Sequence, residues 1–113
     1  MIIKRKEIEE MPQRFRANLI NSLSGFKSAN LIGSANSKGQ HNLSMVSSVV
    51  HFGANPPIMG FVMRPDSAPR DTLDNILETQ HFTINQVSAD FWQQAHQTAA
   101  RYAQDISEFN EAN

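Results

Sequence analysis

The sequence predicts a small mixed or antiparallel β-sheet with helices around it. Apolar residues recur at helical spacing near both ends of the chain, whereas short apolar or alternating runs, separated by glycine and proline turns, fill residues 29–87. At 113 residues the chain has the length of a single domain, which we expect to span residues 1–113.

The first helix is expected at about residues 12–24. Pro12 suits a first helical turn, and Gly25 suits the residue that follows a helix. The apolar face of this helix would consist of Phe15, Leu19, Ile20 and Leu23.

A strand-rich middle part is expected next. Residues 29–34 form a short apolar run, residues 36–39 have turn chemistry, and an alternating strand starts at Asn42. The run Ile58–Met63 is apolar on both faces, which predicts a strand that is covered on each side. The prolines within residues 55–57 separate this strand from the one before it.

A short helix and a further strand follow. The helix is expected to start near Asp71 or Thr72, and residues 81–87 alternate as a strand. The buried stripe of the helix would be Leu73, Ile76 and Leu77.

A final helix is expected at about residues 88–103, with Ser88 as its N-cap. One face of this helix would hold Phe91, Ala95, Thr98 and Tyr102. The four predicted strands are few for a closed sheet, so open strand edges would favour pairing with a second chain.

Composition and charge exclude several classes of function. The chain has no cysteine, which excludes disulfides, thiol nucleophiles and cysteine-ligated metal centres. We expect no membrane span, because no apolar run reaches about 20 residues, and we expect a cytoplasmic location, because the first residues lack a signal peptide. The net charge of −1 gives nucleic acid no general attraction, so we expect no nucleic-acid partner.

The placement of charge is uneven. No Asp or Glu occurs between Met11 and Pro65, which lowers the electrostatic cost of an anionic ligand. The alternative is that Asn and Ser simply serve as the polar residues of this stretch. The cations within it are Arg14, Arg16, Lys27, Lys38 and Arg64.

The segment Asn42–Val50 is a candidate ligand-binding strand. Its alternation breaks at Val46, and Ser47 and Ser48 then place a small hydroxyl on each face, which lets a flat ligand approach the backbone. The alternative is an irregular strand whose serines form local hydrogen bonds.

The loop from Arg64 to Thr72 is a candidate anion site. Arg64 and Arg70 would supply charge, Ser67 and Thr72 would supply neutral donors, and a helix start favours an anion. Asp71 argues against a bare phosphate contact, so its better role is to cap the helix or to fix an arginine. The alternative is an ordinary capped helix with solvated charges.

Other sites of chemistry are not indicated. The four histidines are too scattered for a metal site, and the chain lacks the glycine-rich dinucleotide, Walker and nucleophile-elbow motifs.

Several short segments, taken in order, resemble the flavin reductase-like FMN-binding split-barrel family (flavoredoxin-like). The resemblance covers about residues 25–87, and residues 96–98 and 107–109 look like its continuation. The matching segments are Leu31–Ser34, Gly39, Asn42–Leu43, Ser47, Asn55–Pro57, Arg64–Pro65, Arg70–Ile76 and Phe82–Asn85.

The resemblance implies a mainly β fold with α, a Greek-key split barrel with flanking helices that is usually dimeric and holds FMN near the subunit interface. Family chains usually continue with several more strands, so we expect a barrel that is incomplete at the C-terminus. Many members also have a proline and aromatic residues where this chain has Met45, Val46 and Ser48.

The implied FMN contacts fall into two groups. One group would lie along the flavin ring, with backbone groups of Ser44 to Ser48 near its polar edge: Asn42, Leu43, Ser44, Met45, Ser47, Ser48 and Val49. The other group would surround the phosphate: Arg64, Ser67, Arg70, Asp71 and Thr72.

The implied function is that of an FMN-binding flavoprotein, a flavin reductase or oxidoreductase that passes hydride or electrons through bound FMN. NAD(P)H or a reduced electron-donor protein would be a further partner, the chain would form a homodimer, and no side chain needs to act as a general acid or base. The alternatives are a non-catalytic electron carrier or storage module, and a truncated fragment that acts only as a dimerising scaffold.

Overall fold

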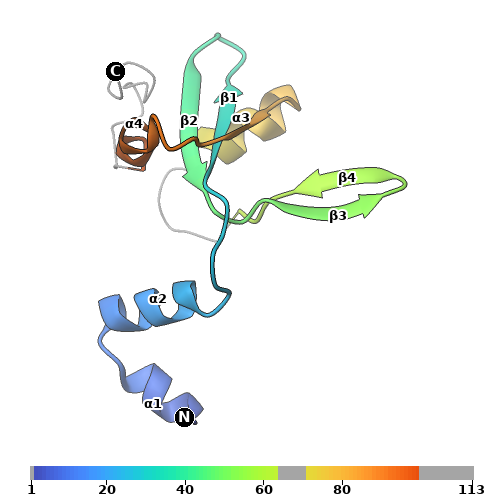
Figure 1. The fold of residues 1–113 in the computed structure, drawn as a ribbon. Coiled ribbons are helices and arrows are strands. Elements are labelled where there is room, and N and C mark those ends of the chain that lie inside the picture. Colours follow the sequence, from blue (N-terminus) through green and yellow to red (C-terminus); the bar gives the residue numbers. More distant parts are fainter. Residues whose placement is uncertain (1, 64–70, 100–113) are drawn as a thin grey trace.

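The computed structural model describes residues 2–63 and 71–99. Within them, a three-stranded antiparallel sheet has the order β2-β1-β5, and β3 and β4 form a separate two-stranded hairpin (Figure 1). The elements are α1 (Arg5–Glu10), α2 (Gln13–Ser22), β1 (Asn30–Ala35), β2 (His41–Val46), β3 (Val50–Ala54), β4 (Pro57–Gly60), α3 (Asp71–Thr79), β5 (Thr83–Gln86) and α4 (Trp92–Gln97).

The centre of the fold is β1, which is paired on both sides. Its alternate residues Asn30, Ile32 and Ser34 are buried, and Ile32 lies opposite Ser44 of β2 and Ile84 of β5. Because successive side chains of a strand point to opposite faces, these three residues define the buried face of the sheet. The helix α3 contacts β1 and β2.

The buried side of α3 is polar. Thr72 and Asn75 are buried, and Asn75 Nδ2 donates to Ser34 Oγ at 3.2 Å. The expected buried stripe of Leu73, Ile76 and Leu77 is therefore wrong in part: Leu73 and Ile76 are half-buried, whereas Leu77 is 69% exposed. The reason is that hydrogen-bonding groups on β1 and β2 face this helix, so its polar residues turn inward to satisfy them.

The turn between β1 and β2 is the expected one. Gly39 has a φ of 78°, which a glycine adopts at no steric cost, and Asn36 Oδ1 accepts from the backbone N–H of Lys38 at 3.0 Å. Glu78 of α3 accepts hydrogen bonds from the hydroxyl and backbone N–H of Ser37, and these bonds lower the pKa of the Glu78 carboxyl.

The strand β2 ends at Val46, where the alternation breaks. Ser47 and Ser48 lie in a bend and not on the two faces of a continuing strand, so that part of the expectation is wrong. The chain starts a separate strand at Val50, which is why the described residues hold five strands where four were predicted.

The hairpin of β3 and β4 extends away from the three-stranded sheet (Figure 1). The run Ile58–Met63 is not a strand covered on each side: β4 ends at Gly60, and Ile58 and Met59 are exposed. The Phe52 ring lies over Gly60, where a Cβ would come within 2.7 Å of it. Residues 55 and 56 form the turn between the two strands, but Pro57 is the first residue of β4 and pairs with Ala54, so the expected separation by residues 55–57 is correct only in part.

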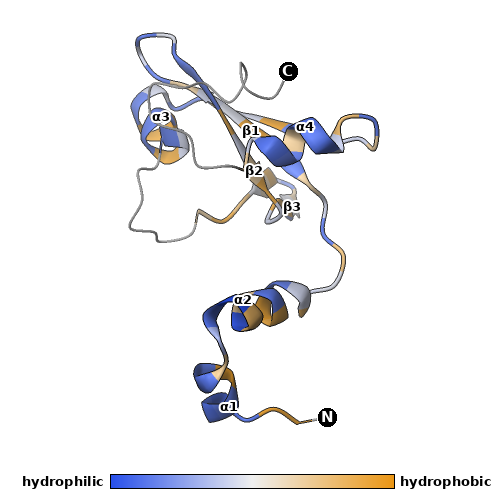
Figure 2. Ribbon diagram, turned by 90° about the vertical axis from the view of Figure 1, so that its left-hand side faces the viewer, coloured by the Kyte–Doolittle hydropathy of each residue, from blue (hydrophilic) through white to orange (hydrophobic). Residues whose placement is uncertain are grey.

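The N-terminal part contains two helices in place of the single one expected. The expected helix at residues 12–24 corresponds to α2, whose N-cap is Pro12, and α1 precedes it. Both helices stand apart from the three-stranded sheet in two perpendicular views, and α2 carries apolar residues on its surface (Figure 2). The exposed ones are Phe15, Ile20 and Leu23.

The last described helix, α4, is shorter than expected. It starts at Trp92 with Phe91 as N-cap, so Ser88 is not the cap; the Ser88 hydroxyl accepts from the N–H of Asp90 at 3.3 Å. Ala95 and Thr98 are buried, as the expected face predicted. Tyr102 lies outside the described residues. None of the described helices is long and apolar enough to cross a membrane.

Candidate functional site

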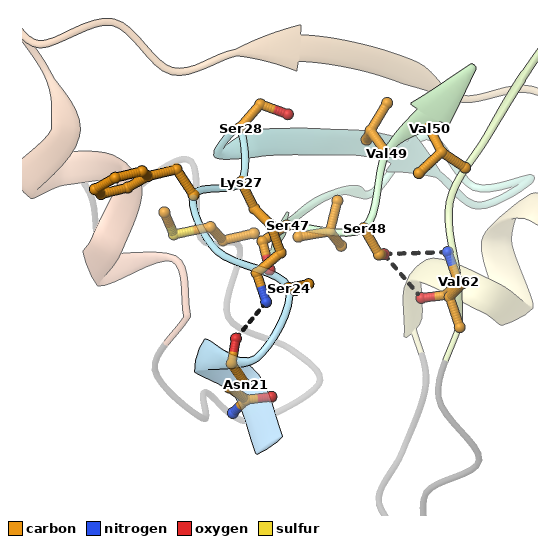
Figure 3. A pocket seen from close by; sticks show the side chains of 12 residues that line it. Asn21, Ser24, Lys27, Ser28, Ser47, Ser48, Val49, Val50 and Val62 are labelled. Carbon is orange, nitrogen blue, oxygen red and sulfur yellow. Dashed lines mark hydrogen bonds between the residues drawn. The ribbon is translucent and has the colours of Figure 1, made fainter. Parts of the chain in front are cut away.

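A pocket of about 920 Å³ lies where the end of α2 and the segment after it approach the bend between β2 and β3 (Figure 3). Its lining combines apolar side chains with hydroxyl groups. The lining residues are Asn21, Ser24, Phe26, Lys27, Ser28, Met45, Val46, Ser47, Ser48, Val49, Val50 and Val62.

Ser48 fixes the shape of this pocket. Its hydroxyl accepts from the backbone N–H of Val62 at 3.1 Å and donates to the Val62 carbonyl at 3.3 Å (Figure 3). This pair of bonds ties the bend to the segment that follows β4. Ser47, in contrast, is exposed, and its hydroxyl makes no hydrogen bond within the described part of the chain.

Four of the residues predicted along the ring line this pocket: Met45, Ser47, Ser48 and Val49. The other three, Asn42, Leu43 and Ser44, lie within β2, and Leu43 and Ser44 pair with Gly33 and Ile32 of β1. The structure therefore brings the second half of the predicted ring group to the pocket and keeps the first half along the strand.

The other eight lining residues were not predicted as site residues, and two of them are Phe26 and Lys27. These two lie in the segment between α2 and β1, which has no periodic pattern of its own. Phe26 is fully exposed, and the ammonium of Lys27 donates to the carbonyl of Asn21 at 2.6 Å (Figure 3). The signal that could have found Lys27 is its place within the acid-free stretch of the sequence.

Only some of the residues predicted to surround the phosphate lie in the described part of the chain. Asn42 Nδ2 donates to Thr72 Oγ1 at 2.7 Å, so the start of β2 meets the start of α3. Asp71 is the first residue of α3, and its first turn also holds Asp74. Arg64, Ser67 and Arg70 lie outside the described residues.

Thr72, one of the described residues predicted around the phosphate, contacts Asn42 at the start of β2, whereas the pocket lies at the other end of this strand. Asn42 and Ser47 are five residues apart, which corresponds to roughly 16 Å along a strand. This arrangement suits an elongated ligand with a flat ring at one end and an anionic group at the other.

Among residues 2–63 and 71–99, no group of three or more His, Asp or Glu side chains is placed to hold a metal ion.

Comparison with known proteins gives a consistent family. The flavin reductase like domain matches residues 23–113. A proposed flavin reductase with a split barrel domain from Shewanella frigidimarina NCIMB 400 is 53% identical, with a TM-score of 0.91 over 98% of this chain. The match covers 55% of the Shewanella protein, so the chain spans about half its length. A comparison with curated proteins returned no match.

Two further solved structures share the fold at lower identity. The 2-nitrobenzoate 2-nitroreductase NbaA of Pseudomonas fluorescens is 24% identical, with a TM-score of 0.80 over 99% of this chain and 52% of its own. Component B of nitrilotriacetate monooxygenase from Bacillus cereus is 22% identical, with a TM-score of 0.78. This match covers 99% of this chain and 55% of the Bacillus protein.

The likenesses agree on the split-barrel fold, mainly β with flanking helices, which confirms the fold class predicted from the sequence. Within the described residues the barrel is not closed. The family match over residues 23–113 and the 53% identity to the Shewanella protein lead to one conclusion: this chain belongs to the flavin reductase like domain family.

Proposed function

We propose that the chain binds FMN and forms the flavin-holding part of a flavin reductase-type oxidoreductase. The observation that carries this proposal is the pocket beside the β2–β3 bend. It gathers Met45, Ser47, Ser48 and Val49 in a chain of the flavin reductase like family.

The described lining fits a flavin ring. A volume of about 920 Å³ lies within the range of about 300–1,000 Å³ typical of small-molecule sites. Met45, Val49 and Val62 offer apolar surface to the faces of a flat ring, and the hydroxyl of Ser47 remains available to its polar edge. A large side chain at Ser47 would occupy this space.

The start of α3 supports the phosphate end of the proposal. The bond between Asn42 and Thr72 holds the first turn of α3 beside β2, at the end opposite the pocket. Asp71 and Asp74 make this turn acidic, so a phosphate there needs cationic partners. Arg64 and Arg70 are the predicted partners, and Ser67 is the predicted neutral donor.

FMN, when bound, supplies the hydride and electron chemistry. The residues of this chain would bind and orient the ring, anchor the phosphate and keep water from one face. No general acid or base is assigned. NAD(P)H, or a reduced electron-donor protein, is the proposed source of electrons.

We also propose that the chain works as a homodimer. Apolar side chains on α2 and on the β3–β4 hairpin are exposed, and the pocket lies between the bases of these two elements. A second copy could cover both surfaces and complete the site. The cytoplasmic location stays a prediction.

The test is a titration with FMN and with riboflavin, which lacks the phosphate. We expect Arg70→Ala to lower FMN affinity roughly ten- to a hundredfold, because a charge-assisted contact contributes about 1.5–3 kcal/mol, and to leave riboflavin affinity unchanged. Equal losses for both ligands would contradict the phosphate assignment.

A kinetic assay separates the reductase from the electron carrier. We expect NAD(P)H to be oxidised when FMN is present. Binding of FMN without any oxidation of NAD(P)H would favour the non-catalytic carrier.

A further inference from the structure

The pocket beside the β2–β3 bend carries a single formal charge among its described lining residues, and that charge is positive. All the lining residues fall between Asn21 and Val62, inside the stretch of sequence that has no Asp or Glu. Lys27 is the charged one. The acid-free stretch therefore forms the described lining of the pocket. This lining contains no carboxylate that could neutralise the positive charge of Lys27.

The ammonium of Lys27 is held in place. It donates to the Asn21 carbonyl at 2.6 Å, and Asn21 belongs to the last turn of α2 and itself lines the pocket (Figure 3). An ammonium group has three N–H donors, so this bond leaves two for a ligand. The last turn of α2 thus holds a cation in the lining of the pocket, which also includes Ser47.

A fixed cation distinguishes the two redox states of the proposed ligand. When a nicotinamide donates a hydride to FMN, the nicotinamide loses two electrons and the flavin ring gains two electrons and one proton. The ring therefore gains one negative charge, whereas the phosphate charge stays the same. A positive charge beside the ring stabilises the reduced form more than the oxidised form.

We infer that Lys27 makes this pocket bind reduced FMN more tightly than oxidised FMN, and thereby raises the reduction potential of the bound flavin. This inference rests on the proposed function, since it requires the ring to occupy the pocket. The competing explanation is that Lys27 only caps the carboxyl end of α2, as lysines at helix ends often do. A cap would affect the two redox states equally.

The experiment measures the dissociation constants of oxidised FMN and of dithionite-reduced FMN, under nitrogen and at mildly alkaline pH, for the 113-residue chain. The variants are Lys27→Met, which removes the charge, and Lys27→Arg, which keeps it. Lys38→Met is the matched control, because Lys38 is an exposed lysine in the β1–β2 turn outside the lining. Far-UV circular dichroism reports whether α2 remains folded.

We expect Lys27→Met to weaken the binding of reduced FMN about tenfold and that of oxidised FMN less than twofold. A tenfold change in this ratio lowers the potential of the bound flavin by about 30 mV, because the couple transfers two electrons. Lys27→Arg and Lys38→Met should keep the wild-type ratio. The effect should shrink from about 0.1 M to about 1 M salt, since the lysine is exposed.

Two results would overturn the inference while leaving the proposed function intact. The first is an unchanged ratio in Lys27→Met with equal losses for both redox states, which is the behaviour of a helix cap. The second is a loss for FMN in both states with no loss for riboflavin, which would place Lys27 at the phosphate. Failure of the wild-type chain to bind FMN in either state would instead contradict the proposed function.

Discussion

Ser47 and Ser48 are neighbours in the bend after β2, and their hydroxyl groups have different surroundings. Ser48 donates to and accepts from the backbone of Val62, whereas Ser47 is exposed and lies in the pocket lining. The sequence predicted that the alternation breaks at Val46, but it also predicted that the two serines lie on opposite faces of the strand, which is wrong. The sequence could not predict which serine forms the hydrogen bonds that hold the bend, because these bonds depend on the position of Val62, which is distant in sequence.

Stability measurements should separate these two serines. We expect Ser48→Ala to lower the free energy of unfolding by about 1–2 kcal/mol, because it removes both hydrogen bonds to Val62. Ser47→Ala should change it by less than about 0.5 kcal/mol, because that side chain is exposed. Urea unfolding of both variants checks the prediction, and equal losses would contradict the assigned roles.

Glu78 is expected to make the stability of the fold depend on pH. The hydrogen bonds from Ser37, with a smaller contribution from Lys38, lower the pKa of the Glu78 carboxyl below its usual value of 4.5. A lowered pKa in the folded state means that the ionised carboxyl stabilises the fold above pH 4.5, and that this contribution is lost as the pH falls through the lowered value.

We therefore expect Glu78→Gln to lower the urea midpoint at neutral pH, and the difference from the wild type to vanish as the pH falls below 4.5. Asp74→Asn removes an exposed carboxyl from the same helix and serves as the control. A difference that persists at low pH would show that Glu78 acts through packing and not through its charge.

At the scale of elements, α3 joins the parts of the candidate site through polar contacts. Its residues Thr72 and Asn75 meet Asn42 of β2 and Ser34 of β1. The sequence predicted where the helix starts but not which side is buried, since Leu77 on the expected stripe is largely exposed. Hydrophobic spacing identifies residues that share a face, but the polar groups on the sheet decide which face turns inward.

This polar docking can be tested on the helix itself. We expect Asn75→Ala to cost about 1–3 kcal/mol in the free energy of unfolding, because it leaves the buried Ser34 hydroxyl without its partner. Leu77→Ala should cost less than about 0.5 kcal/mol, although it removes more apolar surface, because the leucine is exposed. If Leu77→Ala proves the more destabilising of the two, the apolar stripe and not the polar face positions α3.

The sequence predicted those elements that a pattern within a few neighbouring residues defines. It did not predict features that depend on contacts between residues far apart in the chain. The turn at Gly39 and the helix α2 follow from glycine, proline and apolar spacing within a few residues. The run Ile58–Met63 shows the limit: its composition matches a strand covered on each side, yet Ile58, Met59 and Val62 are exposed. The pocket likewise depends on Phe26 and Lys27 meeting the bend after β2, which no local pattern encodes.

At the scale of the whole molecule, apolar side chains of the described residues face solvent on both elements beside the pocket. One set lies on α2, where Phe15 is 60% exposed, and the other lies on the β3–β4 hairpin, where Phe52 is 67% exposed. Large exposed apolar patches commonly mark an interface with another chain, and the sheet edges that no described strand covers support the same interpretation.

We expect the chain to sediment as a dimer at micromolar concentration and to dimerise more tightly when FMN is added, because a ligand shared across the interface shifts the equilibrium by mass action. Phe52→Glu should weaken the dimer, and Lys38→Glu, on the β1–β2 turn, should not. A monomer with and without FMN would mean that these apolar surfaces do not pair two copies.

The central claim is that FMN binds in the pocket beside the β2–β3 bend. The most direct measurement is a titration of FMN into the wild type and into Ser47→Leu, followed by flavin fluorescence and absorbance. Ser47 is exposed in the lining, so leucine should occupy part of the space for the ring without unfolding the chain. The account predicts saturable binding to the wild type and at least a tenfold weaker affinity for a folded Ser47→Leu. Equal affinity of the two proteins would contradict it, because the ring would then have to lie elsewhere.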